Sequence, residues 1–292
     1  GNSANGITQG RGLLSALEQS MPQLRLPQQE GISGREIYKM LVLRGEAADA
    51  AMLAAAGPPL QWEGADALKM WIAPHPCGAM PVLQTPSWHD FLQLVRALAH
   101  RCEPFQLDDG VHAQAISGLI HWGLIREFGR QSRARLIVLH EAPYGSVLAS
   151  ALPVDLSKSQ WLAASTALRL EHELTHLATK RLLGEMRLNL LDELIADCMG
   201  MVAALGWFNA GLFGRCLGID AEQGRWSTYT KELSESDARQ AVASVMARSY
   251  ELDQMLSDYP WLLQPAQAMQ RLQWLSTQRL DQTISPPQAI RN

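Results

Sequence analysis

The spacing of apolar and polar residues predicts a mainly helical chain. Apolar residues that recur every three or four positions are typical of helices with one buried face. Clusters of Gly, Pro and small polar residues separate these stretches and favour turns. The predicted helices span residues 33–56, 66–72, 87–101, 110–128, 157–183, 189–205, 234–256 and 265–280.

Several of these helices carry recognisable end signals. Ser33 is followed three residues later by Glu36, which is the spacing of a capping box. Small polar side chains favour the N-cap position because their oxygen accepts a hydrogen bond from a free backbone N–H. Glycine favours the C-terminal end, where the chain turns into the left-handed region. The other cap candidates are Ser87, Ser157 or Ser159, Gly184, Asn189, Gly206 and Ser234.

Strands are predicted in only two places. Residues 135–140 are short, apolar and β-branched, and residues 147–154 show a weaker pattern of the same kind. Residues 1–30 are rich in Gly, Ser, Gln and Pro and predict a flexible tail with at most one short helix. Residues 209–229 predict a loose segment with four glycines. The fold class is therefore mainly α (α+β), with a small β-sheet preceding the helix that starts at residue 157.

No internal repeat or low-complexity linker divides the chain. We expect a tail over residues 1–30, a helical N-terminal subdomain over residues 31–107 and a metal-binding catalytic domain over residues 108–292. The last two are expected to form one compact unit. A chain of 292 residues with 47% hydrophobic residues is long enough to bury a sizeable core.

Composition narrows the classes of partner. The net charge of −4 gives no electrostatic reason to expect nucleic acid or an anionic membrane as partner. No apolar run approaches the roughly 20 residues that span a bilayer, and the N-terminus lacks the apolar region of a signal peptide. We therefore expect a cytoplasmic protein. The four cysteines form no C-x-x-C pair, so a cysteine-based zinc site is not expected.

The strongest chemical signal is the segment His172-Glu173-Leu174-Thr175-His176, an H-E-x-x-H motif inside a predicted helix. Residues four apart on a helix are separated by only about 40° around the axis, so His172 and His176 point the same way. Their imidazole nitrogens can converge on one metal ion. Glu173 is rotated by about 100° from His172, beside the ion, where a base acting on water is needed.

A second pair with the same spacing lies on the next predicted helix. Glu193 and Asp197 are four residues apart, and one loop near residues 184–188 brings their helix back against the first. A catalytic zinc ion takes three protein ligands, and Glu193 is placed to be the third. Asp197 is then placed to accept an N–H from a ligand histidine. The alternative is a surface helix whose His and Glu side chains are only solvated.

The sequences HELTH and ELIAD together resemble the H-E-x-x-H…E-x-x-x-D pattern of the gluzincin metallopeptidases, the thermolysin-like group. The resemblance covers about 30 residues closely. It implies zinc ligands His172, His176 and Glu193, general base Glu173, and Asp197 as support for a ligand histidine. It also implies cleavage of a peptide or amide bond through Glu-assisted attack of metal-bound water. In that group an edge strand before the motif helix lines the substrate cleft, a place that Leu136 to Leu139 would take.

Amide hydrolysis also needs a donor that stabilises the oxyanion. Arg225 and Tyr229 are the candidates, because they lie in a Gly-rich loop after the two metal helices. A surface arginine and a packed tyrosine would look the same in the sequence. His140 and Tyr144 are weaker candidates.

Two other functions stay open at this stage. Two histidines and one carboxylate also suit non-haem Fe2+, in an enzyme that modifies a small metabolite with oxygen. Alternatively, a binding module could retain the metal site without turnover. The expected substrate, a peptide or a small-molecule amide, and the oligomeric state are not specified by these patterns.

Overall fold

The chain folds into two compact units, residues 1–141 and residues 142–292. The computed structural model describes residues 8–26, 32–47, 50–55, 57–58, 60–76, 78–107, 110–122, 134–184, 189–221 and 224–287. The boundary between the units follows Glu141 and not residue 107, because residues 113–140 complete the sheet of the N-terminal unit. The expected mainly α (α+β) class is confirmed, and every strand of the sheet precedes the helix that carries the H-E-x-x-H motif.

The N-terminal unit contains a five-stranded mixed sheet in the order β1-β2-β3-β5-β4. Only β3 and β5 pair in parallel, and α4 (Trp88–Ala99) lies between them in the chain and packs on β3, β4 and β5. Phe91, Leu94 and Val95 of α4 are fully buried in this contact. The strands are β1 (Thr8–Gln9), β2 (Lys69–Ala73), β3 (Met80–Thr85), β4 (Ala113–Leu119) and β5 (Ala134–His140).

Residues 8–26 form regular elements that contribute buried residues to this unit's core, so the expectation of a flexible tail is wrong for them. The helix α1 (Arg11–Ser20) buries its three leucines, and β1 pairs with β2. The 3-10 turn η1 (Pro22–Arg25) then buries Leu24 completely. The apolar patch in this segment is one face of an amphipathic helix, and the core that covers it comes from distant residues.

Three predicted helices of this unit differ from the structure. The predicted helix 33–56 is divided into α2 (Ile32–Tyr38), the π-helical turn η2 (Lys39–Arg44) and α3 (Ala50–Ala55), with Gly45 at φ +67 ending the second piece. The side chain of Ser33 lies outside the described part of the chain. Residues 66–72 form the 3-10 turn η3 (Ala65–Ala67) and β2. Residues 113–119, predicted as helix, form β4, and residues 123–133 lie outside the described part.

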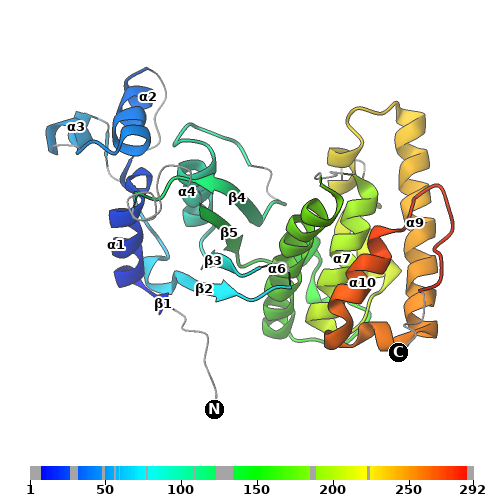
Figure 1. Ribbon diagram of the computed structural model, residues 1–292. Helices are drawn as coiled ribbons and strands as arrows, with labels where there is room; N and C mark the ends of the chain where they lie inside the picture. The colour runs from blue at the N-terminus through cyan, green and yellow to red at the C-terminus, as the bar shows by residue number, and fades with distance from the viewer. Residues whose placement is uncertain are drawn as a thin grey trace, which may run out of the picture. The chain divides into compact units, whose positions relative to one another are not determined.

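The C-terminal unit is helical, and α7 is its central helix, packed against α6, α9 and α10 (Figure 1). The caps predicted for its longest helices are confirmed: Ser157, Asn189 and Ser234 accept N-cap hydrogen bonds, and Gly184 and Gly206 are left-handed C-caps. Residues 147–154 form no strand. The elements of this unit are η4 (Tyr144–Ser146), η5 (Ala149–Ala151), α6 (Lys158–Leu183), α7 (Leu190–Leu205), α8 (Ala210–Leu217), η6 (Arg225–Tyr229), α9 (Glu235–Asp258), η7 (Pro260–Leu263), η8 (Pro265–Gln267) and α10 (Ala268–Ser276).

The segment 209–229 is more ordered than the sequence predicts. Asn209 caps α8, and Gly218 ends it at φ +72. Gly218 and Gly224 then lie so close that a side chain on either would collide with the other's backbone. This contact closes the loop between them and leads directly into η6.

Among the described helices, none is by itself both long and apolar enough to cross a membrane. The bent pair of α7 and α8 reaches that length and composition only when the two are taken together.

Candidate metal centre

The first half of the site lies on one face of α6. His172 and His176 are one turn apart, and both are buried, with 7% and 9% of their surface exposed. The same face carries Trp161, Ser165 and Arg169 at the preceding turns, and all three are buried. The buried face of α6 therefore continues as a row of polar side chains up to the two histidines.

The second half lies in the first two turns of α7. Asn189 caps this helix by accepting hydrogen bonds from the backbone N–H groups of Leu191 and Asp192. Glu193 and Asp197 are 1% and 0% exposed. Two carboxylates buried this deeply are costly unless cations and donors compensate them. The environment of this pair must therefore supply positive charge.

Facing contacts show that the two helices are antiparallel. Positions 172 and 176 of α6 face Glu193, position 172 also faces Asp197, and Leu168 faces Gly200 further along α7. Residues with lower numbers on α6 thus contact residues with higher numbers on α7. This is the hairpin that the two i,i+4 pairs predict.

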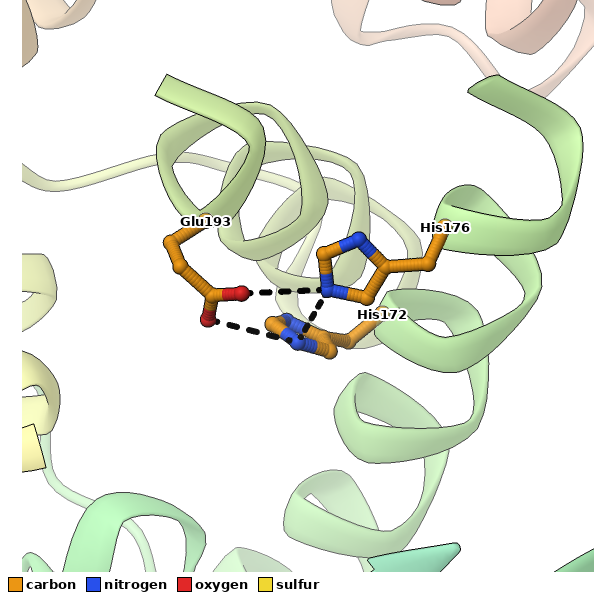
Figure 2. A group of neighbouring side chains, drawn as sticks. All are labelled: His172, His176 and Glu193. Atoms are coloured by element: carbon orange, nitrogen blue, oxygen red, sulfur yellow. Dashed lines mark hydrogen bonds and ion pairs between the residues drawn. The ribbon is translucent and has the colours of Figure 1, made fainter. Parts of the chain in front are cut away.

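Three donor atoms converge between the helices (Figure 2). The Nε2 atoms of His172 and His176 are 3.0 Å apart. The Glu193 carboxylate lies 3.2 Å from Nε2 of His176 through Oε1 and 3.6 Å from Nε2 of His172 through Oε2. Ligand bonds of about 2.0–2.1 Å in tetrahedral geometry separate donor atoms by about 3.3 Å. The three side chains are thus spaced as ligands of one small divalent cation would be.

Asp197 orients His172 from the other side of the imidazole ring. Its Oδ1 lies 2.7 Å from Nδ1 of His172, the contact that the sequence spacing predicts. A carboxylate in this place accepts the Nδ1–H and leaves the lone pair on Nε2. The nitrogen that faces His176 and Glu193 is then the one free to bind a metal.

Arg225 supplies the positive charge beside the two carboxylates. Its Nη2 donates to Glu193 Oε2 at 2.7 Å and lies 3.4 Å from each oxygen of Asp197. Burial alone would raise the pKa of both carboxyl groups, but Arg225 and the neighbouring histidines outweigh it and hold the pKa of each below its usual value. Burial likewise opposes the charge on Arg225, and the surrounding acidic groups outweigh it and raise its pKa.

Tyr229 follows Arg225 on η6, and the negative charge of Glu193 acts on its hydroxyl. Burial and the nearby negative charge raise the pKa of its hydroxyl above the usual value. Arg225 and Tyr229, the two candidates from the sequence, therefore both lie at the site. Arg225 contacts the carboxylate of Glu193, and Tyr229 lies near enough to be influenced by its charge. The action of either residue as an oxyanion donor stays a prediction.

Glu173 is half-buried, one residue from His172 on α6. Among the described residues, no side chain holds its carboxylate by a hydrogen bond. Its negative charge contributes to raising the pKa of His176, although burial of His176 acts the other way and the contact with Glu193 is the larger favourable effect. The carboxylate is thus near the donor atoms and available to a further group.

Tyr144, a weak candidate from the sequence, is a central member of the site. Its hydroxyl lies 3.0 Å from Nδ1 of His172, donates to Asp197 Oδ1 and accepts from Arg225 Nη1 at 3.2 Å. No short-range spacing in the sequence connects Tyr144 to its partners, because they lie 28 to 81 positions away.

The remaining candidates belong to the N-terminal unit. His140 ends β5 and pairs with His112 through their Nδ1 atoms at 2.9 Å. The strand that contains Leu136 and Leu139 is not an edge strand, because β5 pairs with β3 on one side and β4 on the other.

Comparison with known proteins gives a family but no activity. A family model described as a family of unknown function, DUF7005, matches residues 4–135 and 130–286. The chain belongs to this family. No curated protein and no solved structure was found to match. Membership in DUF7005 assigns no reaction, so the chemistry must be argued from the site.

Proposed function

We propose that this chain is a zinc-dependent hydrolase that cleaves a peptide or amide bond. One observation carries the proposal: the donor atoms of His172, His176 and Glu193 converge at tetrahedral spacing, with Glu173 next to them on the same helix. Zinc sites with three protein ligands keep a position open for catalysis, whereas purely structural sites use four. Among the described residues, no fourth His, Cys, Asp or Glu joins the group.

Zinc bound to these residues would act as a Lewis acid and lower the pKa of water to about 7. Glu173 would accept the proton of the attacking water and then deliver it to the leaving nitrogen. This role requires a carboxylate that is not already committed to another side chain. Glu173 is half-buried and interacts with the charge of Arg169, but within the described part of the chain no hydrogen bond to another side chain occupies its carboxylate.

The remaining residues hold the ligands in place. Asp197 fixes the ring of His172, and Arg225 fixes the carboxylate of Glu193. Because Arg225 offsets part of the negative charge of Glu193 and Asp197, the site can keep both carboxylates ionised before a cation enters. This arrangement supports a preformed metal centre.

The first experiment measures metal content and hydrolysis together. The chain is purified without added metal, analysed for zinc and iron, and assayed on fluorogenic peptides and small amides. Glu173→Gln should retain zinc and lose hydrolysis, while Glu171→Gln, on the same helix but turned away by about 200°, should retain both. Unchanged turnover in Glu173→Gln would remove Glu173 as the base.

The same measurements separate the competing functions. Stoichiometric iron with oxygen-dependent activity would replace the hydrolase by a non-haem iron enzyme. Stoichiometric zinc with no turnover of any peptide or amide would favour a binding module. A chain that takes up neither metal would overturn the proposed site.

A further inference from the structure

Tyr144 is buried at the rear of the candidate metal centre. Only 3% of its surface is exposed. Its hydroxyl contacts Nδ1 of His172, the carboxylate of Asp197 and the guanidinium of Arg225. The contacts with Nδ1 and with Asp197 lie on the side of the His172 ring opposite Nε2, the nitrogen that faces His176 and Glu193. The hydroxyl therefore contacts the support of His172 and not the nitrogen that would bind the metal.

Two cations lie over the aromatic ring of Tyr144. The guanidinium carbons of Arg169 and Arg225 lie 5.5 and 5.4 Å from the ring centroid. Such contacts are stronger where water is excluded, as it is around this buried ring. Arg169 is also held by the carbonyl oxygens of Ala142 and Pro143 at 3.1 and 3.3 Å. The ring thus has little freedom to turn its hydroxyl away from Asp197.

The backbone of Tyr144 is held as firmly as its ring. Its N–H donates to Ser165 Oγ at 2.9 Å, two turns before His172 on α6. The next residue, Gly145, has φ +57, and a Cβ there would lie 2.5 Å from the Cα of Cys216 in α8. Trp161 fixes the end of the same turn by donating to the Val147 carbonyl at 2.7 Å. The turn 144–147 is therefore attached to two helices.

We propose that Tyr144 is a positioning residue of the metal centre, acting on His172 through the carboxylate of Asp197. The inference rests on the proposed metal site. A carboxylate has several lone pairs and can rotate among donors. The Tyr144 hydroxyl donates to Oδ1 of Asp197, the same oxygen that lies 2.7 Å from Nδ1 of His172, and so holds this oxygen where it accepts the Nδ1–H. Without the hydroxyl, this carboxylate keeps only His172 and Arg225 as partners among the described side chains, and Nε2 of His172 is held less firmly toward the ion.

The test is zinc affinity of the full chain, measured by competition with a chelator of known affinity. Residues that support metal ligands contribute about 10–100-fold to affinity. Tyr144→Phe keeps the ring beside the two arginines and is expected to weaken zinc binding by about tenfold, the lower end of that range. Tyr250→Phe makes the same chemical change on the exposed face of α9, where 59% of the residue is exposed, and should leave affinity unchanged.

A second measurement uses the metal-free chain and does not depend on activity. The 15N chemical shifts of the imidazole ring report which nitrogen carries the proton. His172 should carry it on Nδ1 in the unaltered chain and in Tyr250→Phe, and should become a mixture of tautomers in Tyr144→Phe. A role limited to general packing would lower stability without moving this ratio.

A milder variant keeps the proposal testable if Tyr144→Phe does not fold. Ser165→Ala removes only the hydrogen bond to the Tyr144 backbone and should weaken zinc binding severalfold, less than Tyr144→Phe and more than Tyr250→Phe. Zinc affinity and tautomer ratio equal to those of Tyr250→Phe in either folded variant would overturn the role of Tyr144. Failure of the unaltered chain to bind zinc would overturn the metal centre itself, and this role with it.

Discussion

Gly200 of α7 lies directly against the backbone carbonyl of Leu168 on α6. A Cβ atom on Gly200 would be 2.7 Å from that oxygen, closer than such atoms are found in proteins. Leu168 is one turn before His172, and Gly200 is one turn after Asp197. The absence of a side chain at this position therefore lets the two helices approach each other beside the candidate ligands.

Gly200→Ala is expected to push α6 and α7 apart and to weaken zinc binding. Forcing an extra methyl group into a closely packed contact costs about 1–3 kcal/mol, here against a rigid backbone atom. Gly12→Ala is the matched control, because Gly12 lies in a helix and nothing is within 4 Å of its added Cβ. That control should be neutral or stabilising by up to about 1 kcal/mol. Chelator competition and denaturant unfolding measure both effects, and equal behaviour of the two variants would show that the contact is unimportant.

The buried thiol of Cys102 should make the chain less stable at alkaline pH. The thiol is 5% exposed and donates to the carbonyl of Gln23 at 3.4 Å. Burial raises the pKa of Cys102 from its usual value of 9.0 to about 12. A raised pKa means that the contribution of the thiol to stability is complete below about pH 9 and is lost as the pH rises toward 12. Denaturant unfolding between pH 8 and 11 should show a steeper fall for the unaltered chain than for Cys102→Ala, and parallel curves would contradict this.

Removal of the Glu193 carboxylate should weaken zinc binding more than removal of the Asp197 carboxylate. Glu193→Ala removes a proposed ligand and should abolish stoichiometric zinc binding. Asp197→Ala removes only the support of His172 and should weaken binding by about 10–100-fold. Glu232→Ala, an exposed carboxylate, should have no effect. Metal analysis after dialysis against a weak chelator measures the three, and loss of zinc in Asp197→Ala but not in Glu193→Ala would reverse the assignment.

Local sequence signals were sufficient for the helices that carry the metal site. The caps at Ser157 and Asn189 and the i,i+4 pairs act within one or two turns, so short-range spacing predicts both the helices and the direction of their side chains. Asp197 could be placed beside His172 for the same reason.

Contacts between distant residues explain what could not be predicted. The apolar positions of residues 113–119 fit a helix as well as a strand. These residues form a strand because they pair with β5. Leu13, Leu14 and Leu17 gave only a short apolar patch, because the core that buries them comes from residues 38–138. Tyr144 lies 53 residues before Asp197, so no period in the sequence connects them.

Arg225 should stabilise the metal-free chain more than the zinc-loaded chain. Arg225→Met removes the cation that faces Glu193 and Asp197 and leaves their charges buried without it. Breaking a buried pair costs about 3–5 kcal/mol. The Arg225 side chain is 25% exposed, so solvent screening should reduce this to about 1–3 kcal/mol in the metal-free chain. Zinc replaces part of the lost positive charge, so the loss should be smaller with zinc bound, and by linkage zinc should stabilise the variant more than the unaltered chain.

Thermal unfolding with and without zinc measures the difference predicted for Arg225. Arg239→Met is the control, because its ion pair with Glu235 lies on the exposed side of α9 and should contribute little in either state. An equal loss in both states would mean that Arg225 acts by packing alone. An unchanged metal-free chain would mean that Glu193 and Asp197 do not depend on the guanidinium, and that the positive charge they need comes mainly from the two histidines.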